Sequence, residues 1–402
     1  PSGKRGYFEK GTSILQIARQ LGVDLDSVCG GRGICSKCQI TPSYGEFTKH
    51  GVTVAADALS EWNKVEERYN EKRGLAKGRR LGCQACVQGD VVIDVPAESQ
   101  VHKQVIRKDA SARPVKMNPA TRLYYVEVAE PDMHEPSGDF ERLKIALQDQ
   151  WEIRDVELDF FQFNKLQKTL RQGNWAVTVA IFNDHTNTPP RIVEIWPGLY
   201  EEGLYGLAID LGSTTIAAHL TDLKSGEVLK SAGLMNPQIR FGEDLMSRVS
   251  YSMMNSGGDK EMTIVVREAI NSLAEQLQKE TGIEKNSLVE VVFVCNPVMH
   301  HLLLGIDPVE LGQAPFALAS SNSITVNASH LGLSNMNASG RCYILPCIAG
   351  HVGADAAAVA LSEEPNKSDD LVLVVDVGTN AEILLGDKSK VLACSSPTGP
   401  AF

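Results

Sequence analysis

Three cysteines lie within ten residues near the start of the chain, and a fourth follows 45 positions later. Cys29, Cys35 and Cys38 fall in CGGRGICSKC, and Cys83 stands in RLGCQAC. The glycines of the first run let a loop turn tightly and aim backbone N–H groups at sulfur without a Cβ clash. Iron needs thiolates on several sides, and a loop together with one distant strand can supply them. The pattern therefore predicts a metal site built from thiolates.

This spacing resembles the C-x4-C-x2-C…C loop of plant-type [2Fe–2S] ferredoxins, with a first gap of five residues here. The RLGCQ context of the distant cysteine is similar to the adrenodoxin-type branch of that family. The resemblance implies a [2Fe–2S] cluster held by Cys29, Cys35, Cys38 and Cys83, and it leaves Cys86 spare. The alternatives are zinc, whose ribbons usually carry two short paired Cys motifs, and disulfides, which suit small secreted chains.

Length, composition and charge limit the possible classes of protein. At 402 residues the chain should hold two to four domains, and 43% hydrophobic with 22% charged residues is typical of an ordinary soluble protein. A net charge of −11 argues against nucleic acid or an anionic membrane surface as the main partner. No apolar run approaches the length of a membrane span. Nine cysteines, in apolar runs or in the loop, indicate a reducing, cytoplasmic setting.

The first part of the chain, residues 1–95, combines the cysteine loop with local structure on both sides. Apolar residues at 14, 17, 18 and 21 predict a helix that Thr12 or Ser13 caps. A charged helical insert follows the loop, and a strand at 91–95 ends this part. Residues 96–123 lose apolar density and gain Lys, Arg, Pro and Ser, which predicts a linker.

Residues 124–203 predict a small α+β unit that carries no obvious chemistry. Its expected strands cover 124–128, 175–182 and 191–196, and its expected helices lie around 140–147 and 158–170.

The last part, residues 204–402, contains an internal repeat. The segments that begin at Gly206 and Leu371 each read as an apolar strand ending in Asp-x-Gly, a second strand, a turn and a third strand. Two such three-strand meanders predict a duplicated fold with a cleft between its halves. The second copy stops at Phe402, after its third strand, and the chain begins with Pro1 instead of Met. We therefore expect a fragment of a longer protein, with an incomplete second half and a segment ahead of the first residue.

Each copy of the repeat carries a candidate phosphate loop. The run Asp210-Leu211-Gly212-Ser213-Thr214-Thr215 resembles the first phosphate loop of the sugar kinase, actin and heat-shock chaperone superfamily, and Asp376-Val377-Gly378-Thr379-Asn380 resembles the second. A carboxylate at the end of a strand can hold water on Mg2+. Glycine lets the backbone approach phosphate, whose oxygens bind hydroxyl and N–H groups. Phosphoryl transfer mainly needs this positioning and charge neutralisation, so these residues are candidates for binding ATP and Mg2+.

The small-residue run GHVGADAAAVAL lies just upstream of the second loop and is similar to the helix that connects the two halves in that superfamily. On that resemblance Asp355 is a candidate to polarise the attacking water or to hold the metal. The alternative is an Ala-rich packing helix in which Asp355 is a capping residue. The superfamily's glycine-rich adenosine loop is not found before Phe402.

Three further groups of polar residues have weaker patterns. One group surrounds Gly242 and could line the cleft or form a domain contact, although a solvated helix start is favoured: Arg240, Glu243, Asp244 and Arg248. His300 and His301 are adjacent helix positions that point apart, which argues against a shared metal. The remaining cysteines lie in strand-like apolar runs, where core positions are expected: Cys295, Cys342, Cys347 and Cys394.

The order of these parts resembles the reductive activators of corrinoid proteins, from SVCGGRGIC through RLGCQAC to DLGSTT, VGAD and DVGTN. The resemblance implies a β-grasp ferredoxin-like domain, a small α+β domain and an actin-like ATPase fold of duplicated ribonuclease-H-like halves. It also implies an enzyme that reduces Co(II) corrinoid to Co(I) with coupled ATP hydrolysis. Such proteins serve methyl-transfer systems, typically form homodimers and take the electron from an upstream donor.

Two other functions remain open. One is a different ATP-driven electron injector, similar to the dehydratase activators, which share a [4Fe–4S] cluster between subunits and lack an N-terminal ferredoxin. The other is a redox sensor in which the cluster regulates an actin-like binding module and does not reduce a partner.

Overall fold

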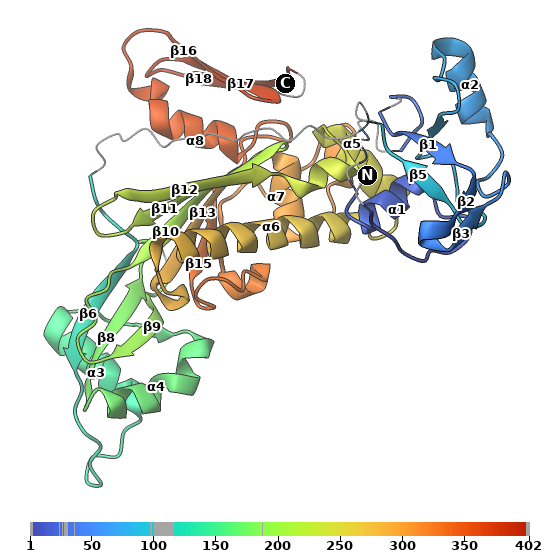
Figure 1. Cartoon of the computed structure of the whole chain (residues 1–402). Coiled ribbons are helices and arrows are strands. Elements are labelled where there is room, and N and C mark those ends of the chain that lie inside the picture. Colours follow the sequence, from blue (N-terminus) through green and yellow to red (C-terminus); the bar gives the residue numbers. More distant parts are fainter. Residues whose placement is uncertain are drawn as a thin grey trace.

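The computed structural model describes residues 3–23, 25, 27, 31–35, 37–96, 99, 116–186 and 188–398. Three units follow one another along the chain, and Figure 1 shows the N-terminal unit beside α5 while the α+β unit lies at the opposite end of the central sheet. In the part of the chain just defined, every helix is too short or too polar to cross a membrane.

The N-terminal unit packs two helices and a short hairpin around a three-stranded sheet of order β4-β1-β5. Helix α1 begins after Ser13, whose hydroxyl accepts a hydrogen bond from Gln16 N at 3.3 Å, so one of the two predicted caps is confirmed. The buried face of α1 packs against Leu81 and Ile40, which confirms the predicted amphipathic helix. The elements are α1 (Ile14–Gln20), β1 (Gln39–Ser43), β2 (Gly45–Phe47), β3 (Val52–Val54), α2 (Lys64–Arg73), β4 (Arg80–Leu81) and β5 (Val92–Asp94).

The α+β unit begins after the predicted linker, most of which lies outside the described residues. Its sheet has the order β6-β8-β9-β7, and the predicted strands and helices are all present with slightly different bounds. Helix α4 begins after Asp159, which caps the N–H of Phe161 at 3.2 Å. The elements are β6 (Thr121–Glu127), α3 (Asp139–Trp151), β7 (Glu157–Leu158), α4 (Phe160–Gln172), β8 (Ala176–Phe182) and β9 (Arg191–Pro197).

A buried polar network joins the α+β unit to the unit that follows it. The carboxylate of Asp159 accepts hydrogen bonds from Asn327 Nδ2 at 2.7 Å and from Ser339 Oγ at 2.8 Å. Glu194 accepts a third from Asn337 Nδ2 at 2.8 Å. Because each of these side chains is buried and bonded, the contact is specific as well as apolar.

The third unit is built on a six-stranded sheet of order β12-β11-β10-β13-β15-β14. Strand β10 is central, antiparallel to β11 and parallel to β13. Helix α6 lies on the sheet against β11 and β12, and α5 and α7 pack against α6 (Figure 1). The elements are β10 (Tyr205–Leu211), β11 (Thr215–Asp222), β12 (Val228–Met235), η3 (Pro237–Phe241), α5 (Leu245–Met254), α6 (Gly258–Thr281), β13 (Leu288–Cys295), α7 (Pro297–Leu304), β14 (Ile324–Asn327) and β15 (Arg341–Ile344).

The second meander forms its own three-stranded sheet, and helix α8 (Ala354–Glu363) joins it to the first. Its antiparallel strands are β16 (Val372–Val377), β17 (Asn380–Gly386) and β18 (Val391–Pro397), in the order of the chain. Helix α8 contacts both β13 and β17, so it lies between the two sheets (Figure 1). The repeat predicted from the sequence is therefore present as two meanders with α8 between them.

Candidate cluster and nucleotide sites

The strand pairing of the N-terminal unit brings two of the predicted cluster cysteines together. Cys38 lies directly before β1 and Cys83 follows β4, and these antiparallel strands pair Gln39 with Leu81. The backbone N–H of Gly82 donates to Cys38 O at 2.7 Å, which holds the residue before Cys83 against Cys38. Residues 45 positions apart in the sequence thus meet at one end of the sheet.

The thiols at this end of the sheet affect one another. The hydrogen bond with the Cys83 thiol, followed by burial and by the nearby Cys35, raises the pKa of Cys38 well above its ordinary value. All three cysteines are free thiols. Sulfur ligands held this close, without a bridge between them, fit a soft metal centre, because a bound cation would favour the thiolates that burial disfavours.

The fourth predicted ligand, Cys29, lies outside the described residues. Within the described ranges, no three His, Cys, Asp or Glu side chains are gathered closely enough to hold a metal ion. The structure therefore brings Cys38 and Cys83 together with Cys35 near them, and the complete four-thiolate set remains a prediction.

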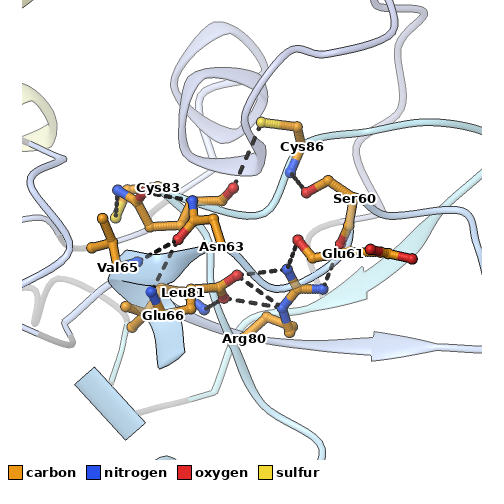
Figure 2. A network of polar contacts seen from close by, with 10 residues as sticks. Ser60, Glu61, Asn63, Val65, Glu66, Arg80, Leu81, Cys83 and Cys86 are labelled. Atoms are coloured by element: carbon orange, nitrogen blue, oxygen red, sulfur yellow. Dashed lines mark hydrogen bonds and ion pairs between the residues drawn. The ribbon is translucent and has the colours of Figure 1, made fainter. Parts of the chain in front are cut away.

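A layer of polar contacts holds the loop around the thiols. Gln84 Nε2 donates to Gly31 O at 2.9 Å and lies 3.5 Å from the Cys83 sulfur. Its side-chain oxygen accepts from Asn63 Nδ2 at 3.0 Å, and Asn63 in turn caps α2 (Figure 2). Gly33 has a φ of +71° and lies where a Cβ would meet Val65 at 2.5 Å, so only glycine fits there. Gln84 and Asn63 were not identified from the sequence.

The charged insert also contains a buried ion pair that the sequence did not single out. The Glu66 carboxylate is completely buried and accepts hydrogen bonds from the Arg80 guanidinium, the shortest at 2.6 Å, and from Leu81 N at 2.9 Å (Figure 2). Arg80 also donates to Ser60 O at 2.9 Å. A buried carboxylate with this many donors is well compensated, and it holds α2 on β4, two residues from Cys83.

Cys86, which the resemblance left spare, has contacts of its own. Its backbone N–H donates to Ser60 Oγ at 3.1 Å, and its thiol lies 3.6 Å from Gln84 O. Burial, followed by the charge of Glu66, raises the pKa of this thiol, which keeps it protonated.

The two predicted phosphate loops contact each other where the two meanders meet. Thr214 Oγ1 and Thr379 Oγ1 lie 2.7 Å apart, although 165 positions separate them in the sequence. Gly212 donates its N–H to Thr215 O at 3.0 Å, and a Cβ at Gly212 would meet that same oxygen at 2.7 Å. The tight turn therefore requires glycine and leaves Ser213, Thr214 and Thr215 at the end of β10.

Two side chains support the first loop from behind. Asn236 Nδ2 donates to Gly212 O at 2.8 Å. Arg248 is completely buried, donates to Ser213 O, and places its Nε 2.9 Å from Gly242 O. Burial lowers the pKa of Arg248 to about 9. The favoured expectation of a solvated helix start is therefore wrong for Arg248, because its hydrogen-bond acceptors are backbone carbonyls inside the fold.

The other polar residues around Gly242 have different positions. Asp244 caps helix α5 by accepting from Ser247 N at 2.6 Å, as a helix start requires. Arg240 belongs to η3 and faces the N-terminal unit, where it donates to Arg19 O at 3.5 Å. The alternative of a domain contact thus applies to Arg240.

Carboxylates from four elements come within electrostatic range of one another beside the two loops. Burial, followed by the charges of Asp210 and Asp376, raises the pKa of Asp355 to about 6. Burial, together with Asp355 and Asp376, raises the pKa of Glu382 to about 7. One oxygen of Glu382 is buried with no hydrogen-bond partner among the described residues. No three of these carboxylates are close enough to hold a metal ion directly, so the acidic group fits a cation that keeps its water shell.

The sequence pointed to Asp210, Asp355 and Asp376 but missed Glu382. Its signal was an acidic residue in the otherwise apolar strand β17, where it pairs directly with Asp376. Asp355 stands in the first turn of α8, where its carboxylate accepts from Ala356 N at 2.9 Å. Helix α8 approaches the end of β13 so closely that a Cβ on Gly353 would lie 2.7 Å from Cys295 O.

The histidine pair and the remaining cysteines lie apart from this chemistry. His301 bonds locally, with Nδ1 2.9 Å from Pro297 O and Nε2 accepting from Ala319 N at 3.1 Å. Burial lowers the pKa of His300 to about 4. Cys295, Cys342 and Cys347 are buried as expected, but Cys394 is exposed. The expectation for Cys394 was wrong because its strand, β18, is an edge strand of the three-stranded sheet.

Three family models match adjoining parts of the chain. The model described as the RACo linker region matches residues 110–202, the RACo middle region matches 205–368, and the C-terminal domain of RACo, the ASKHA domain, matches 370–402. The α+β unit therefore falls within what the family calls its linker region.

Individual relatives match between half of this chain and nearly all of it. The corrinoid activation enzyme RamQ of Eubacterium limosum is 25% identical over 97% of this chain and 58% of its own length. The [Co(II) methylated amine-specific corrinoid protein] reductase of Methanosarcina barkeri is 27% identical over 50% of this chain and 37% of its length. A solved structure titled reductive activator for corrinoid, iron-sulfur protein is 29% identical, with a TM-score of 0.66 over 99% of this chain and 62% of that one.

RamQ and the solved reductive activator match nearly the whole of this chain, and the chain spans about six tenths of the length of each. Over its N-terminal quarter, the similar proteins include [2Fe–2S] ferredoxins, which agrees with the thiol site at Cys38 and Cys83. The ferredoxin-like part, the linker region and the actin-like ASKHA part occur in one order along one chain. The chain therefore belongs to the family of reductive activators of corrinoid proteins.

Proposed function

We propose that this chain is part of an ATP-dependent reductive activator that transfers one electron to the Co(II) corrinoid of a methyl-transfer protein and so regenerates Co(I). The observation that supports this most directly is the presence, in one chain, of a ferredoxin-type thiol site and two facing phosphate loops. The printed functions of the similar proteins, corrinoid activation and reduction of a Co(II) corrinoid protein, agree with it.

The residues of the N-terminal unit would hold a [2Fe–2S] cluster through Cys29, Cys35, Cys38 and Cys83. When bound, such a cluster supplies a one-electron donor, near −400 mV for the plant type. The protein's own contribution is the surrounding shell. Gln84 places an N–H near the Cys83 sulfur, and the ion pair of Glu66 with Arg80 keeps the neighbouring strand in place.

The nucleotide cleft explains why ATP is needed. Each 59 mV of uphill one-electron transfer lowers the equilibrium constant tenfold, so a cluster alone would populate a very low-potential acceptor poorly. ATP helps only if it binds two states of the protein differently. The contact of Thr214 with Thr379 joins the two halves at the point where phosphate would enter, so nucleotide binding and hydrolysis would open and close this cleft.

Each candidate nucleotide residue has a proposed role in the cleft. Asp210 and Asp376 would hold Mg2+ through water, and Asp355, with a pKa of about 6, would orient the attacking water. The hydroxyls and N–H groups of the two loops would bind phosphate oxygens: Gly212, Ser213, Thr214, Thr215, Gly378, Thr379 and Asn380. Glu382 adds a carboxylate beside Asp376 that would strengthen the hold on the cation.

The proposed partners follow from this activity. They are a corrinoid protein or corrinoid-dependent methyltransferase as electron acceptor, an upstream electron donor, and a second copy of the chain in a homodimer. The eight described cysteines are all free thiols, which agrees with the reducing conditions of the cytoplasm.

The direct test compares Cys35→Ser with Cys86→Ser in the full-length protein. We expect Cys35→Ser to abolish reduction of an isolated Co(II) corrinoid protein, followed by visible absorption, while nucleotide affinity stays unchanged. Cys86→Ser should retain reduction, because its thiol lies outside the proposed ligand set. Full corrinoid reduction by Cys35→Ser would refute the proposal. An ATPase rate that does not change when the Co(II) corrinoid protein is added would favour the redox-sensor alternative.

A further inference from the structure

Arg19 extends from the N-terminal unit into the actin-like unit. It lies in the last turn of α1 and is only 6% exposed. Its Nε donates to Arg240 O at 2.5 Å, and its guanidinium lies 4.6 Å from the centroid of the Tyr251 ring and 5.4 Å from that of Phe241. An arginine stacked on rings and bonded across two units makes a specific contact.

A second arginine, from the actin-like unit, contacts the N-terminal unit at the same place. Arg240 donates to Arg19 O at 3.5 Å, and its own guanidinium lies 4.9 Å from the Phe241 ring. Nearby, Gln16 Nε2 donates to Asn255 Oδ1 at 3.3 Å. Figure 1 shows the two elements involved, α1 and α5, side by side. Three hydrogen bonds and two aromatic rings thus join the two units next to the cysteine site.

The positive charge at this contact is only partly compensated. Tyr251 donates its hydroxyl hydrogen to Glu261 at 2.9 Å, so this carboxylate is already engaged with the tyrosine. One terminal nitrogen of Arg19 is buried without a hydrogen-bond partner among the described residues. Burial lowers the pKa of Arg19, and Tyr251 is the main group that opposes that shift. Helix α1, which carries Arg19, lies beside the cysteine site, because Leu15 N–H donates to Gly82 O at 2.8 Å, one residue before Cys83.

On the actin-like side of the contact, Arg19 touches residues of η3, and η3 is bonded to the first phosphate loop. Arg240 and Phe241 belong to η3, which Asn236 caps while its side chain also donates to Gly212 O at 2.8 Å. At the other end of η3, Gly242 O accepts from Arg248, which also bonds Ser213 O. Both ends of η3 are therefore tied to the loop, and its last two residues touch Arg19.

We propose that Arg19 is a positioning residue that docks the ferredoxin-like unit on η3, favours the reduced state of the cluster, and makes the reduction potential depend on the nucleotide. This inference rests on the cluster and nucleotide sites proposed above. One electron added to a thiolate-ligated cluster increases its negative charge, so a nearby cation makes reduction easier. When the phosphate loop and η3 shift, Arg19 moves away from the thiolates. The reduced cluster then loses the stabilising positive charge and becomes a stronger electron donor.

The test compares Arg19→Gln with Arg68→Gln in the full-length protein. Arg68 lies on the exposed face of α2, so both variants lose one positive charge from the same unit. Redox titration followed by electron paramagnetic resonance should show a three- to tenfold lower equilibrium constant for cluster reduction in Arg19→Gln, which is about 30 to 59 mV. Arg68→Gln should match the wild type.

Two further variants separate charge from docking. In the wild type, ADP and a non-hydrolysable ATP analogue should give different potentials, and Arg19→Gln should lose that difference. Arg19→Lys should keep most of the potential but lose the nucleotide response, because lysine lacks the planar group that bonds Arg240 O and stacks on Tyr251. Tyr251→Leu, which removes the ring from the other unit, should act in the same direction as Arg19→Gln.

A measurement without the cluster tests docking alone. In cluster-free protein, amide hydrogen exchange in residues 237–241 should be faster in Arg19→Gln than in Arg68→Gln. Equal exchange, equal potentials of the two variants, or a nucleotide response that persists in Arg19→Gln would overturn the proposal. A wild type without a [2Fe–2S] signal would instead contradict the proposed function, and hydrogen exchange would still decide whether Arg19 docks the units.

Discussion

The two meanders share a sequence pattern but differ in their surroundings. In the first, Leu207, Ile209 and Leu211 of β10 are at most 3% exposed, because β10 lies between β11 and β13 under helix α6. In the second, Leu373 and Val375 of β16 are 61% and 46% exposed, and β16 pairs with β17 alone among the described strands. Equal local sequence therefore gives equal strands, whereas neighbours elsewhere in the chain decide which strand becomes core.

The meanders also differ at the position that faces the aspartate of each loop. Asp210 pairs with Ala217 across β10 and β11, while Asp376 pairs with Glu382 across β16 and β17. The second half thus has a carboxylate pair where the first has one carboxylate. The first half supplies a rigid support for phosphate, and the second supplies most of the negative charge for a cation.

The largest expected difference is in ATP hydrolysis by Asp210→Asn and Asp376→Asn. Asp210 stands on the rigid central strand, so we expect its loss to lower kcat on the order of 10²-fold or more. Asp376 has Glu382 directly beside it, which can replace part of its charge, so its loss should cost about tenfold less. Steady-state ATPase assays of both variants in the full-length protein measure this ratio. Equal losses would show that the halves contribute symmetrically.

Substitutions in β10 and in β16 should change the free energy of unfolding by different amounts. Ile209→Ala empties a site that is 2% exposed and should lower the free energy of unfolding by about 2–4 kcal/mol. Leu373→Ala, at a site 61% exposed, should change it by less than about 0.5 kcal/mol. Urea denaturation of the 402-residue chain, followed by circular dichroism, gives both values. A loss above 1.5 kcal/mol for Leu373→Ala would contradict the exposed position of β16.

The smallest expected effect is a pH dependence that only the second meander should show. Burial and neighbouring carboxylates raise the pKa of Glu382 to about 7, so Mg2+–nucleotide must displace its proton at pH 6 but not at pH 8. Affinity for Mg2+–ADP should rise about three- to tenfold between these values, and Glu382→Gln should flatten the rise. Calorimetric titration measures both, with Glu227→Gln in the first meander as the control. An unchanged slope in Glu382→Gln would assign the proton to another group.

The same raised pKa affects stability without ligand. The folded chain binds this proton more tightly than the unfolded chain, so the contribution to stability is fully present below about pH 4.5 and is lost as the pH rises through about 7.

Local patterns predicted much of the fold. The cap at Ser13, the strands of the α+β unit and both meanders follow from hydrophobic periodicity and turn residues, which act within a few positions of each other. The cysteine spacing and the Asp-x-Gly loops identified the candidate sites for the same reason. Polar residues that support these sites were missed, because they carry no local pattern: Glu66, Asn236 and Glu382. Arg248 was noted beside Gly242, but a solvated helix start was favoured for it.

The sequence by itself determined which chemistry this chain could carry, because thiolate spacing and phosphate loops are short motifs whose geometry is built into neighbouring residues. Only the tertiary structure decided which part of the fold each arginine contacts. Arg19 carries no signal in the sequence, and Arg248 was expected at a solvated helix start. In the fold, α1 and α5 place them against carbonyls and rings more than 30 residues away in the sequence. Burial depends on such long-range neighbours, so the link between the cluster and the nucleotide became visible only in the folded chain.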